Sequence, residues 1–191
     1  MVLYIHGFAS SGKGHKGRVI LKYFGEKAMV PSLPYIPDLA LDTLRQITEH
    51  TLRSKESLFL IGSSLGGFYA TYLSETYDLP AVLINPSVEP WKTLASHTGM
   101  VTNFFDLCSF EWCERHLKQL QRAHISTISK PDNFLLLLQK GDETLDYMVA
   151  KKWFEGAKMV VEDGGSHAFE SFESHLKDIE TFFNSKEKRW S

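Results

Sequence analysis

The chain has 191 residues, of which 43% are hydrophobic and 13% aromatic, and its formal net charge at pH 7 is -2. This length and composition predict one domain with a full hydrophobic core and exclude a globally disordered chain. The near-neutral charge gives no basic surface for nucleic acid, and no apolar run approaches the roughly 20 residues that span a bilayer.

The N-terminus and the cysteines predict the compartment. The opening sequence, MVLYIHGF, lacks the basic start and the small-residue cleavage site of a secretory signal. The cysteines, Cys108 and Cys113, are too few for a disulfide scaffold. We therefore expect the protein to be cytoplasmic, in a reducing environment.

The first half of the chain alternates short apolar runs with helical patterns. Residues 2–5 are apolar without polar alternation, as expected of a strand buried on both faces, and a loop rich in glycine and serine follows. The next expected elements are, in chain order, a helix over 16–27, a strand over 28–33, a helix over 38–54 capped by Asp38, a strand over 58–61, a helix over 67–75 and a strand over 81–84.

The second half continues this alternation after one long interruption. Residues 87–132 carry several aromatic side chains and one helical pattern over 111–121. Because structureless connections of this length are uncommon, we interpret the segment as either a lid or a crossover with its own helices. The remaining expected elements are a strand over 134–138, a helix over 146–155, a strand over 158–161, a helix over 171–184 and a frayed tail over 186–191. The pattern predicts an α/β fold over residues 1–191, with about six mainly parallel strands flanked by helices.

Ser64 lies in a glycine-flanked pattern between a predicted strand and a predicted helix. Residues 58–70 read LFLIGSSLGGFYA, in which Gly62 and Gly66 stand two positions before and after Ser64. A serine on a sharp strand-to-helix turn needs such glycines, because the residues two positions away on each side come too close for larger side chains. Ser63 would have far larger neighbours at those positions. The pattern therefore predicts that Ser64 is a nucleophile.

A serine nucleophile needs a base and a group that orients the base. Of the eight histidines, His167 lies in a loop directly after the last predicted strand, and it follows the serine and the acid in the chain order typical of such sites. Asp142, just after the fifth strand, is the preferred acid, because the carboxyl ends of parallel strands share one edge of the sheet. Glu143 and Asp146 remain alternatives, and Asp146 is also placed to cap the next helix.

Two backbone N–H groups are the expected donors to an oxyanion that forms when the serine attacks a carbonyl. Leu65, the residue after the serine, would supply one of them. Phe8, in the loop after the first strand, is placed to supply the other. We expect His6 to shape this loop and not to act as the base.

Two further motifs resemble those of nucleotide-binding and zinc-binding proteins, but each lacks residues that its pattern requires. Residues 7–13 match G-x-x-x-x-G-K, yet Gly14 follows where a P-loop needs Ser or Thr, and no later strand ends in a suitable aspartate. Cys108 and Cys113 lie near His116, but no second pair of zinc ligands accompanies them. We therefore expect no nucleotide, no cofactor and no metal.

Five blocks of the chain carry a family resemblance. They are, in order, HGFASS, IGSSLGGFYATYL, LPAVLINP, LLLQKGDETLDY and EDGGSHAFESFE. Together they resemble the small bacterial YqiA-like esterases of the α/β-hydrolase superfamily, over nearly the whole chain and most weakly from about residue 94 to 130. The resemblance implies a minimal α/β-hydrolase without the first antiparallel strands of larger relatives, with Ser64, Asp142 and His167 as a catalytic triad. It also implies hydrolysis of a small-molecule carboxylic ester or thioester.

The sequence thus predicts a serine esterase, with two alternatives. An acyl-CoA thioesterase would need a cationic surface for the phosphates of CoA, which Lys13, Lys16 and Arg18 could provide near the site entrance. A non-catalytic binding module is the alternative from another class, because fold alone does not fix function.

Overall fold

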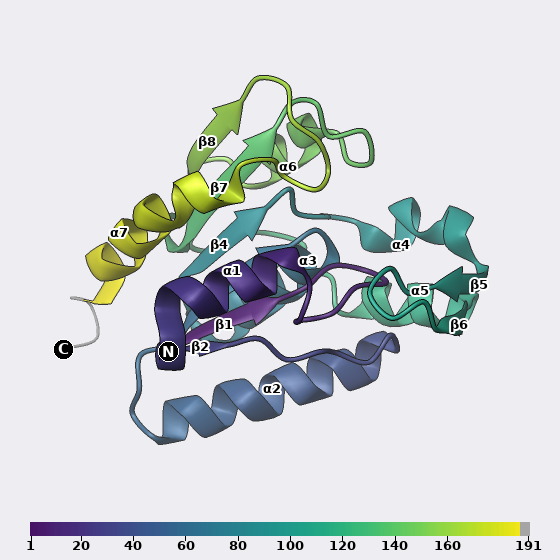
Figure 1. Ribbon diagram of the computed structural model, residues 1–191, viewed down its shortest axis with the longest axis horizontal. Helices are drawn as coiled ribbons and strands as arrows, with labels where there is room; N and C mark the ends of the chain where they lie inside the picture. Colours follow the sequence, from purple (N-terminus) through teal and green to yellow (C-terminus); the bar gives the residue numbers. More distant parts are fainter. Residues whose placement is uncertain (188–191) are drawn as a thin grey trace.

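A six-stranded sheet runs through the middle of the protein (Figure 1), as seen in a computed structural model that describes residues 1–187. Its strand order is β2-β1-β3-β4-β7-β8, and every neighbouring pair is parallel. The strands are β1 (Val2–Ile5), β2 (Ala28–Met29), β3 (Phe59–Ser63), β4 (Ala81–Ile84), β7 (Phe134–Gln139) and β8 (Lys158–Glu162). The predicted α/β fold is confirmed.

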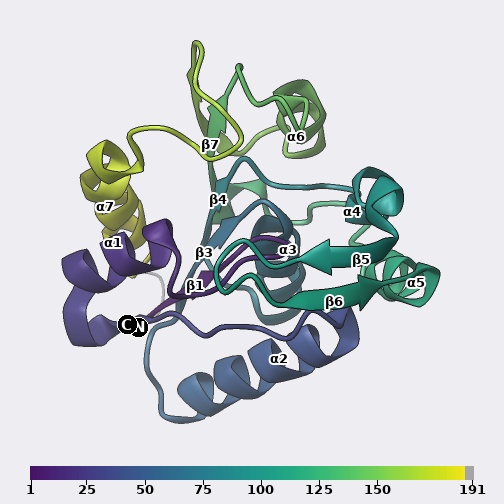
Figure 2. The same ribbon diagram turned by 45° about the vertical axis from the view of Figure 1, so that its right-hand side comes forward.

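Helices cover both faces of this sheet, and Figure 2 shows α1 and α7 together on one side. The helices that flank the sheet are α1 (His15–Phe24), α2 (Pro37–Arg53), α3 (Leu65–Tyr77), α6 (Tyr147–Trp153) and α7 (Leu176–Glu187). Successive strand residues point to opposite faces, so Leu60 packs in the core beneath α2 and α3, whereas Ile61 packs in the core beneath α1 and α7. Strands such as Phe134–Gln139, apolar up to the last residue, are buried from both sides for this reason.

The insertion between β4 and β7 has its own secondary structure. It contains α4 (Pro90–Thr93), an antiparallel hairpin of β5 (Gly99–Thr102) and β6 (Ser109–Trp112), and α5 (Glu114–Arg122). Trp112 is fully buried in the main core and anchors the segment there. The tip of the hairpin reaches the loop after β1, because the N–H of Phe104 donates to the carbonyl oxygen of Ala9 at 2.8 Å.

Several expected boundaries of helices and strands were wrong. The first is the C-terminal end of the second strand. This strand was expected over 28–33 but ends at Met29. Pro31 and Pro34 have no N–H to donate to a sheet. The N–H of Leu33 donates instead to Nε2 of His6, at 2.9 Å. The segment after Met29 therefore follows the loop that His6 begins, and not the edge of the sheet.

The helix boundaries also differ from the expected ones. Helix α2 begins at Pro37 with Ile36 as its N-cap, so the expected cap, Asp38, lies in the first turn and pairs with Arg122 at 3.0 Å. The helix expected over 111–121 begins only at Glu114, because the preceding residues form β6. Short 3₁₀ turns follow α1 (Gly25–Lys27) and precede α7 (Phe172–His175). Of the expected frayed tail, residues 188–191 lie outside the described residues.

Candidate active site

Ser64 occupies the sharp turn between β3 and α3. Its backbone angles are φ 55° and ψ -119°, a conformation that residues with side chains rarely adopt and that the surrounding structure must impose. The N–H of Ser64 donates to the carbonyl oxygen of Ile84 at 3.0 Å, and its own carbonyl oxygen accepts from the N–H of Ser87 at 3.1 Å. These bonds to the end of the neighbouring strand fix the serine at the carboxyl edge of the sheet.

The two flanking glycines sit where the backbone segments nearly touch. A Cβ atom added to Gly62 would lie 2.3 Å from the carbonyl oxygen of Gly66. One added to Gly66 would lie 2.0 Å from the carbonyl oxygen of Ile5. Neither position can hold a side chain while Ser64 keeps this turn, which is the physical content of the glycine-flanked pattern.

Ser64, His167 and Asp142 form a continuous chain of hydrogen bonds. His167 Nε2 lies 3.0 Å from Ser64 Oγ, and His167 Nδ1 lies 2.9 Å from Oδ2 of Asp142. The carboxylate only accepts hydrogen bonds, so Nδ1 carries the proton and the lone pair of Nε2 faces the serine hydroxyl. The imidazole in this tautomer can take the proton of Ser64.

The Asp142 carboxylate is held firmly in place. Its side chain is 2% exposed, whereas that of His167 is 24% exposed. Oδ1 of Asp142 accepts from the N–H groups of Thr144 and Leu145, both at 2.8 Å. These donors stabilise the ionised carboxylate in its buried position and orient it toward the imidazole.

The two alternative acids make other contacts. Glu143 is exposed, and its carboxylate accepts from the backbone N–H of His167 at 3.0 Å, a hydrogen bond that holds the pKa of Glu143 below its usual value. Asp146 caps α6 by accepting from the N–H of Met148 at 2.9 Å, as the sequence indicated. Of the three carboxylates, Asp142 is the one that contacts the imidazole.

His6 holds the loop after β1. Its Nε2 accepts from the N–H of Leu33 at 2.9 Å, so Nδ1 carries the proton and donates to the carbonyl oxygen of Gly7 at 2.8 Å. Burial lowers the pKa of His6, which favours the neutral ring that this pattern requires. A neutral, buried histidine that bridges two loops shapes the backbone beside Ser64.

Phe8 and Leu65, the expected donors to the oxyanion, both line the same cavity as Ser64. Leu65 is the first residue of α3, so its N–H belongs to the set that a helix leaves without an intrahelical partner. The ring of Phe8 packs edge-on against Trp112 and Phe110 of the insertion, with ring centroids 4.8 and 5.8 Å apart. This packing fixes the backbone of the loop that carries Phe8.

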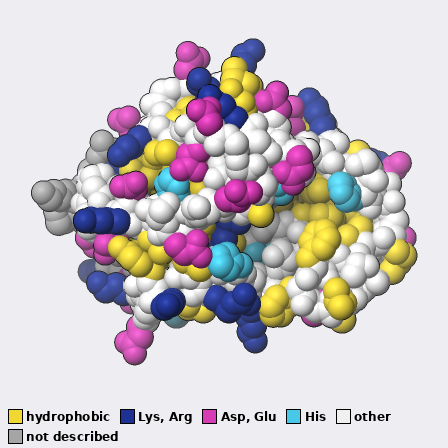
Figure 3. Space-filling view, turned by 45° about the horizontal axis from the view of Figure 1, so that its top comes forward, with side chains coloured by type: hydrophobic (Ala, Val, Ile, Leu, Met, Phe, Trp, Pro, Cys, Tyr) yellow, Lys and Arg dark blue, Asp and Glu magenta, His cyan; other side chains and the backbone are white. Residues whose placement is uncertain are grey.

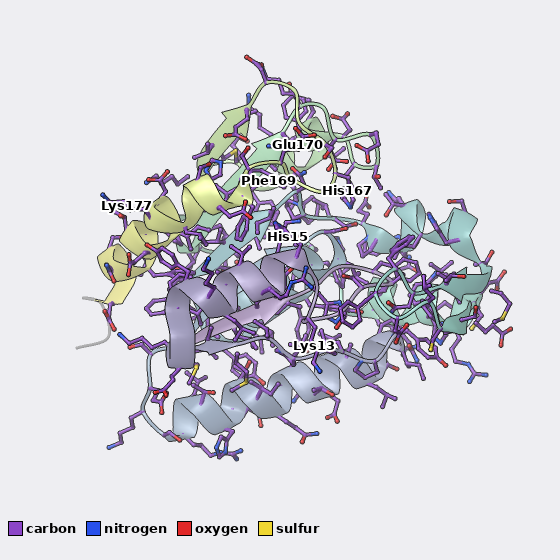
Figure 4. The ribbon with its side chains drawn as sticks, viewed as in Figure 1. Lys13, His15, His167, Phe169, Glu170 and Lys177 are labelled. Carbon is purple, nitrogen blue, oxygen red and sulfur yellow. The ribbon has the colours of Figure 1, made fainter. Side chains whose placement is uncertain are left out.

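A cavity of about 630 Å³ opens beside Ser64 and His167. Figure 3 shows this hollowed face, with hydrophobic side chains gathered along one edge. Its lining includes the apolar side chains of Phe8, Leu94 and Phe104 and also the start of α1. In Figure 4 the loop of His167 lies beside that start, at His15. The volume is in the range of sites that enclose small organic molecules.

Two buried amides, Asn85 and Gln139, hold the loop of His167 and were missed in the sequence. Asn85 Nδ2 donates to the carbonyl oxygen of Ser166 at 3.0 Å, and Asn85 Oδ1 accepts from the N–H of Gln139 at 3.0 Å. Gln139 Oε1 in turn accepts from the N–H groups of Ser166 and Glu170, at 3.1 and 2.9 Å. Both amides are 3% exposed. The available signal was a polar residue at the end of each apolar strand, where a buried amide must have partners.

The two motifs that indicated other chemistry have structural roles. Gly12 packs so tightly that an added Cβ would lie 2.1 Å from the carbonyl oxygen of Val30, which accounts for this glycine without a phosphate. The backbone N–H of Cys113 donates to His116 Nδ1 at 3.3 Å, at the start of α5. Over residues 1–187, no three His, Cys, Asp or Glu side chains are grouped as metal ligands. The same residues include no helix long and apolar enough to cross a membrane.

Solved structures share this architecture along nearly the whole chain. Est1E from Butyrivibrio proteoclasticus aligns with a TM-score of 0.71 at 12% identity, covering 97% of this chain and 86% of that one. Alpha/beta hydrolase domain-containing protein 10 from mouse aligns with a TM-score of 0.67 at 13% identity, covering 96% of this chain and 89% of that one. A monoacylglycerol lipase from Paleococcus ferrophilus aligns with a TM-score of 0.66 at 17% identity, covering 95% and 93%. The fold is therefore the α/β-hydrolase fold.

Sequence comparison gives the family. A UPF0227 protein of Pectobacterium atrosepticum is 26% identical over 187 residues, covering 95% of this chain and 98% of the relative. The UPF0227 protein YcfP of Escherichia coli is 21% identical over 197 residues, with the same coverage. The model of "Uncharacterised protein family (UPF0227)" matches residues 1–184. These matches confirm the YqiA-like resemblance, and the chain belongs to the UPF0227 family.

Proposed function

We propose that this protein is a serine hydrolase that cleaves carboxylic esters through an acyl-enzyme intermediate. The observation that carries the proposal is the hydrogen-bonded chain from Asp142 through His167 to Ser64, with the serine on a strained turn that opens into a cavity. A serine hydroxyl becomes a useful nucleophile when a neighbouring imidazole accepts its proton. The α/β-hydrolase fold is consistent with this chemistry but does not establish it.

The geometry supports the following sequence of steps. Ser64 Oγ attacks the ester carbonyl carbon while His167 Nε2 takes the hydroxyl proton, and Asp142 stabilises the imidazolium. The carbonyl oxygen becomes an oxyanion, for which the N–H groups of Phe8 and Leu65 are the proposed donors. His167 then gives its proton to the departing alcohol oxygen. In the second half of the reaction, His167 takes a proton from a water molecule, whose oxygen attacks the acyl-enzyme carbonyl carbon. His167 then gives this proton to Ser64 Oγ as the bond between Oγ and the acyl carbon breaks, which releases the acid and restores Ser64.

We propose that one domain carries this site. Ser64 precedes the insertion at residues 87–132, whereas Asp142 and His167 follow it. The insertion supplies Leu94 and Phe104 to the cavity wall, beside the loop after β1. Residues from before, within and after the insertion thus meet around one cavity, as expected for a single catalytic unit.

The proposed substrate is a small acyl ester, and a thioester is the second candidate. Of the three cationic residues noted for CoA phosphates, Lys16 lines the cavity, whereas Arg18 donates to the carbonyl oxygen of Lys13 at 2.9 Å.

We expect p-nitrophenyl esters of short and medium acyl chains to be hydrolysed above a Ser64→Ala blank, because the apolar lining of the cavity can take the chain. Measuring kcat/KM over ester and thioester chain lengths tests this. Equal rates for wild type and blank would contradict the proposal.

Asn85→Ala should lower both activity and stability, because it leaves the Gln139 N–H and the Ser166 carbonyl without their partner. We expect kcat/KM for p-nitrophenyl butyrate to fall about 10- to 100-fold, since the loop of His167 shifts. The midpoint of thermal unfolding should fall by roughly 5–20 °C, because each of the two unpaired buried groups costs about 1–3 kcal/mol of folding free energy.

Asn133→Ala is the matched control for this positioning role. Asn133 is also a buried asparagine, but its Nδ2 donates to Asp78 at 2.8 Å, at the opposite end of β7. We expect this variant to lose stability and to keep its activity at a temperature where it is folded. Similar activity losses in both variants would show that Asn85 supports the fold and does not position His167.

A further inference from the structure

Lys16 is the single Lys or Arg among the described residues that line the cavity beside Ser64. It is the second residue of α1 and is half-buried. Its ammonium group donates to the carbonyl oxygen of Ala168, the residue after His167. The positive charge is thereby tethered beside the proposed base.

This charge has no carboxylate in direct contact. Over the described residues Lys16 makes no ion pair, and Glu173, the acid whose charge acts on it, is paired with His15 at 2.8 Å. Burial lowers the pKa of Lys16 more than Glu173 raises it. Helix α1 also begins without a side-chain cap and without an acidic residue in its first turn. The start of α1 therefore presents positive potential to the cavity.

The lining of the cavity suits different parts of a substrate. Phe8, Leu94 and Phe104 supply apolar surface, while Lys16 lies beside the loop of His167 through its hydrogen bond to Ala168. His167 must deliver its proton to the departing oxygen, so the alcohol portion of an ester leaves on the histidine side. The alcohol portion therefore passes next to Lys16, and the acyl chain lies along the apolar surface.

We propose that Lys16 binds a carboxylate on the alcohol portion of the ester substrate; this inference rests on the proposed function. One ammonium group matches one carboxylate, whereas sites for phosphate commonly use arginine forks or several donors. A charge-assisted hydrogen bond in a partly desolvated site corresponds to about 10- to 100-fold in kcat/KM. The substrate class is then an ester of a hydroxy acid with an apolar acyl group.

A matched pair of esters tests this assignment. The probes are the butyrate ester of 4-hydroxybenzoate and the butyrate ester of its methyl ester, which differ by one negative charge. The measured quantity is the ratio of kcat/KM for the anionic ester to that for the neutral ester. We expect Lys16→Met to lower this ratio at least about tenfold and Lys16→Arg to restore most of it.

Lys13→Met is the charge-matched control, because Lys13 is exposed, lies three residues away and does not line the cavity. It should leave the ratio unchanged. An unchanged ratio in Lys16→Met, or an equal fall in both methionine variants, overturns the inference while the esterase proposal stands. If wild type hydrolyses neither ester above the Ser64→Ala blank, the proposed function fails and this inference fails with it. Thermal unfolding of each variant separates misfolding from lost recognition, and a folded Lys16→Arg variant keeps the test decisive.

Discussion

Ser64→Ala should lower kcat for p-nitrophenyl butyrate by about 10⁶-fold. The substitution removes the oxygen that forms the acyl-enzyme, and this oxygen is the hydroxyl that lies 3.0 Å from His167 Nε2. The loss should appear in kcat, because the cavity that binds the ester is unchanged.

Ser63→Ala provides the control for this effect. Ser63 is the last residue of β3 and is buried, so the same hydroxyl is deleted one position away. We expect this variant to stay within about tenfold of wild type, since the hydroxyl it lacks forms no acyl-enzyme. A large loss of kcat in Ser63→Ala, together with residual turnover in Ser64→Ala, would show that Ser63 and not Ser64 is the nucleophile.

Asp142→Asn should lower kcat by about 10⁴-fold, which is the second largest expected effect. The amide can donate a hydrogen bond to Nδ1 of His167, which favours the tautomer that carries its proton on Nε2. That tautomer cannot accept the proton of Ser64. The new side chain also no longer stabilises the imidazolium that forms during attack.

Glu143→Gln is the matched change at the neighbouring position. Glu143 contacts the backbone N–H of His167 and not its ring, so we expect kcat to fall less than about tenfold. Steady-state kinetics of the two purified variants, with thermal unfolding as a check on folding, measures both effects. A greater loss in Glu143→Gln than in Asp142→Asn would move the acid to Glu143.

The fold was predictable because its signals are local. Each buried strand of the parallel sheet is a short apolar run, and each flanking helix shows helical spacing. The hairpin of β5 and β6 escaped prediction because its strands are mostly exposed and its connection contains no glycine. Leu107 adopts the left-handed backbone conformation in that connection, with φ 62°. A leucine in the sequence does not indicate such a turn, whereas glycine or asparagine would.

The site was predictable where one residue determines the backbone and unpredictable where distant residues must meet. Gly62 and Gly66 mark the turn of Ser64, because added Cβ atoms would meet the carbonyl oxygens of Gly66 and Ile5 and only glycine fits at the two positions. Asp142 and Glu143 are adjacent and chemically alike, so the contact with the imidazole depends on how the loop after β7 turns. Asn85 donates to the carbonyl oxygen of Ser166, which lies 81 positions later in the chain. Periodic sequence patterns indicate local structure and do not predict a contact between residues so far apart.

The central claim is that Ser64 is an activated nucleophile, and covalent labelling tests it most directly. A fluorophosphonate probe reacts with a serine whose proton a neighbouring base accepts. We expect one adduct per chain, located at Ser64 by peptide mass spectrometry, absent in Ser64→Ala and formed much more slowly in Asp142→Asn. An unlabelled wild-type protein, or an adduct on a different residue, would contradict the assignment of Ser64 as the nucleophile.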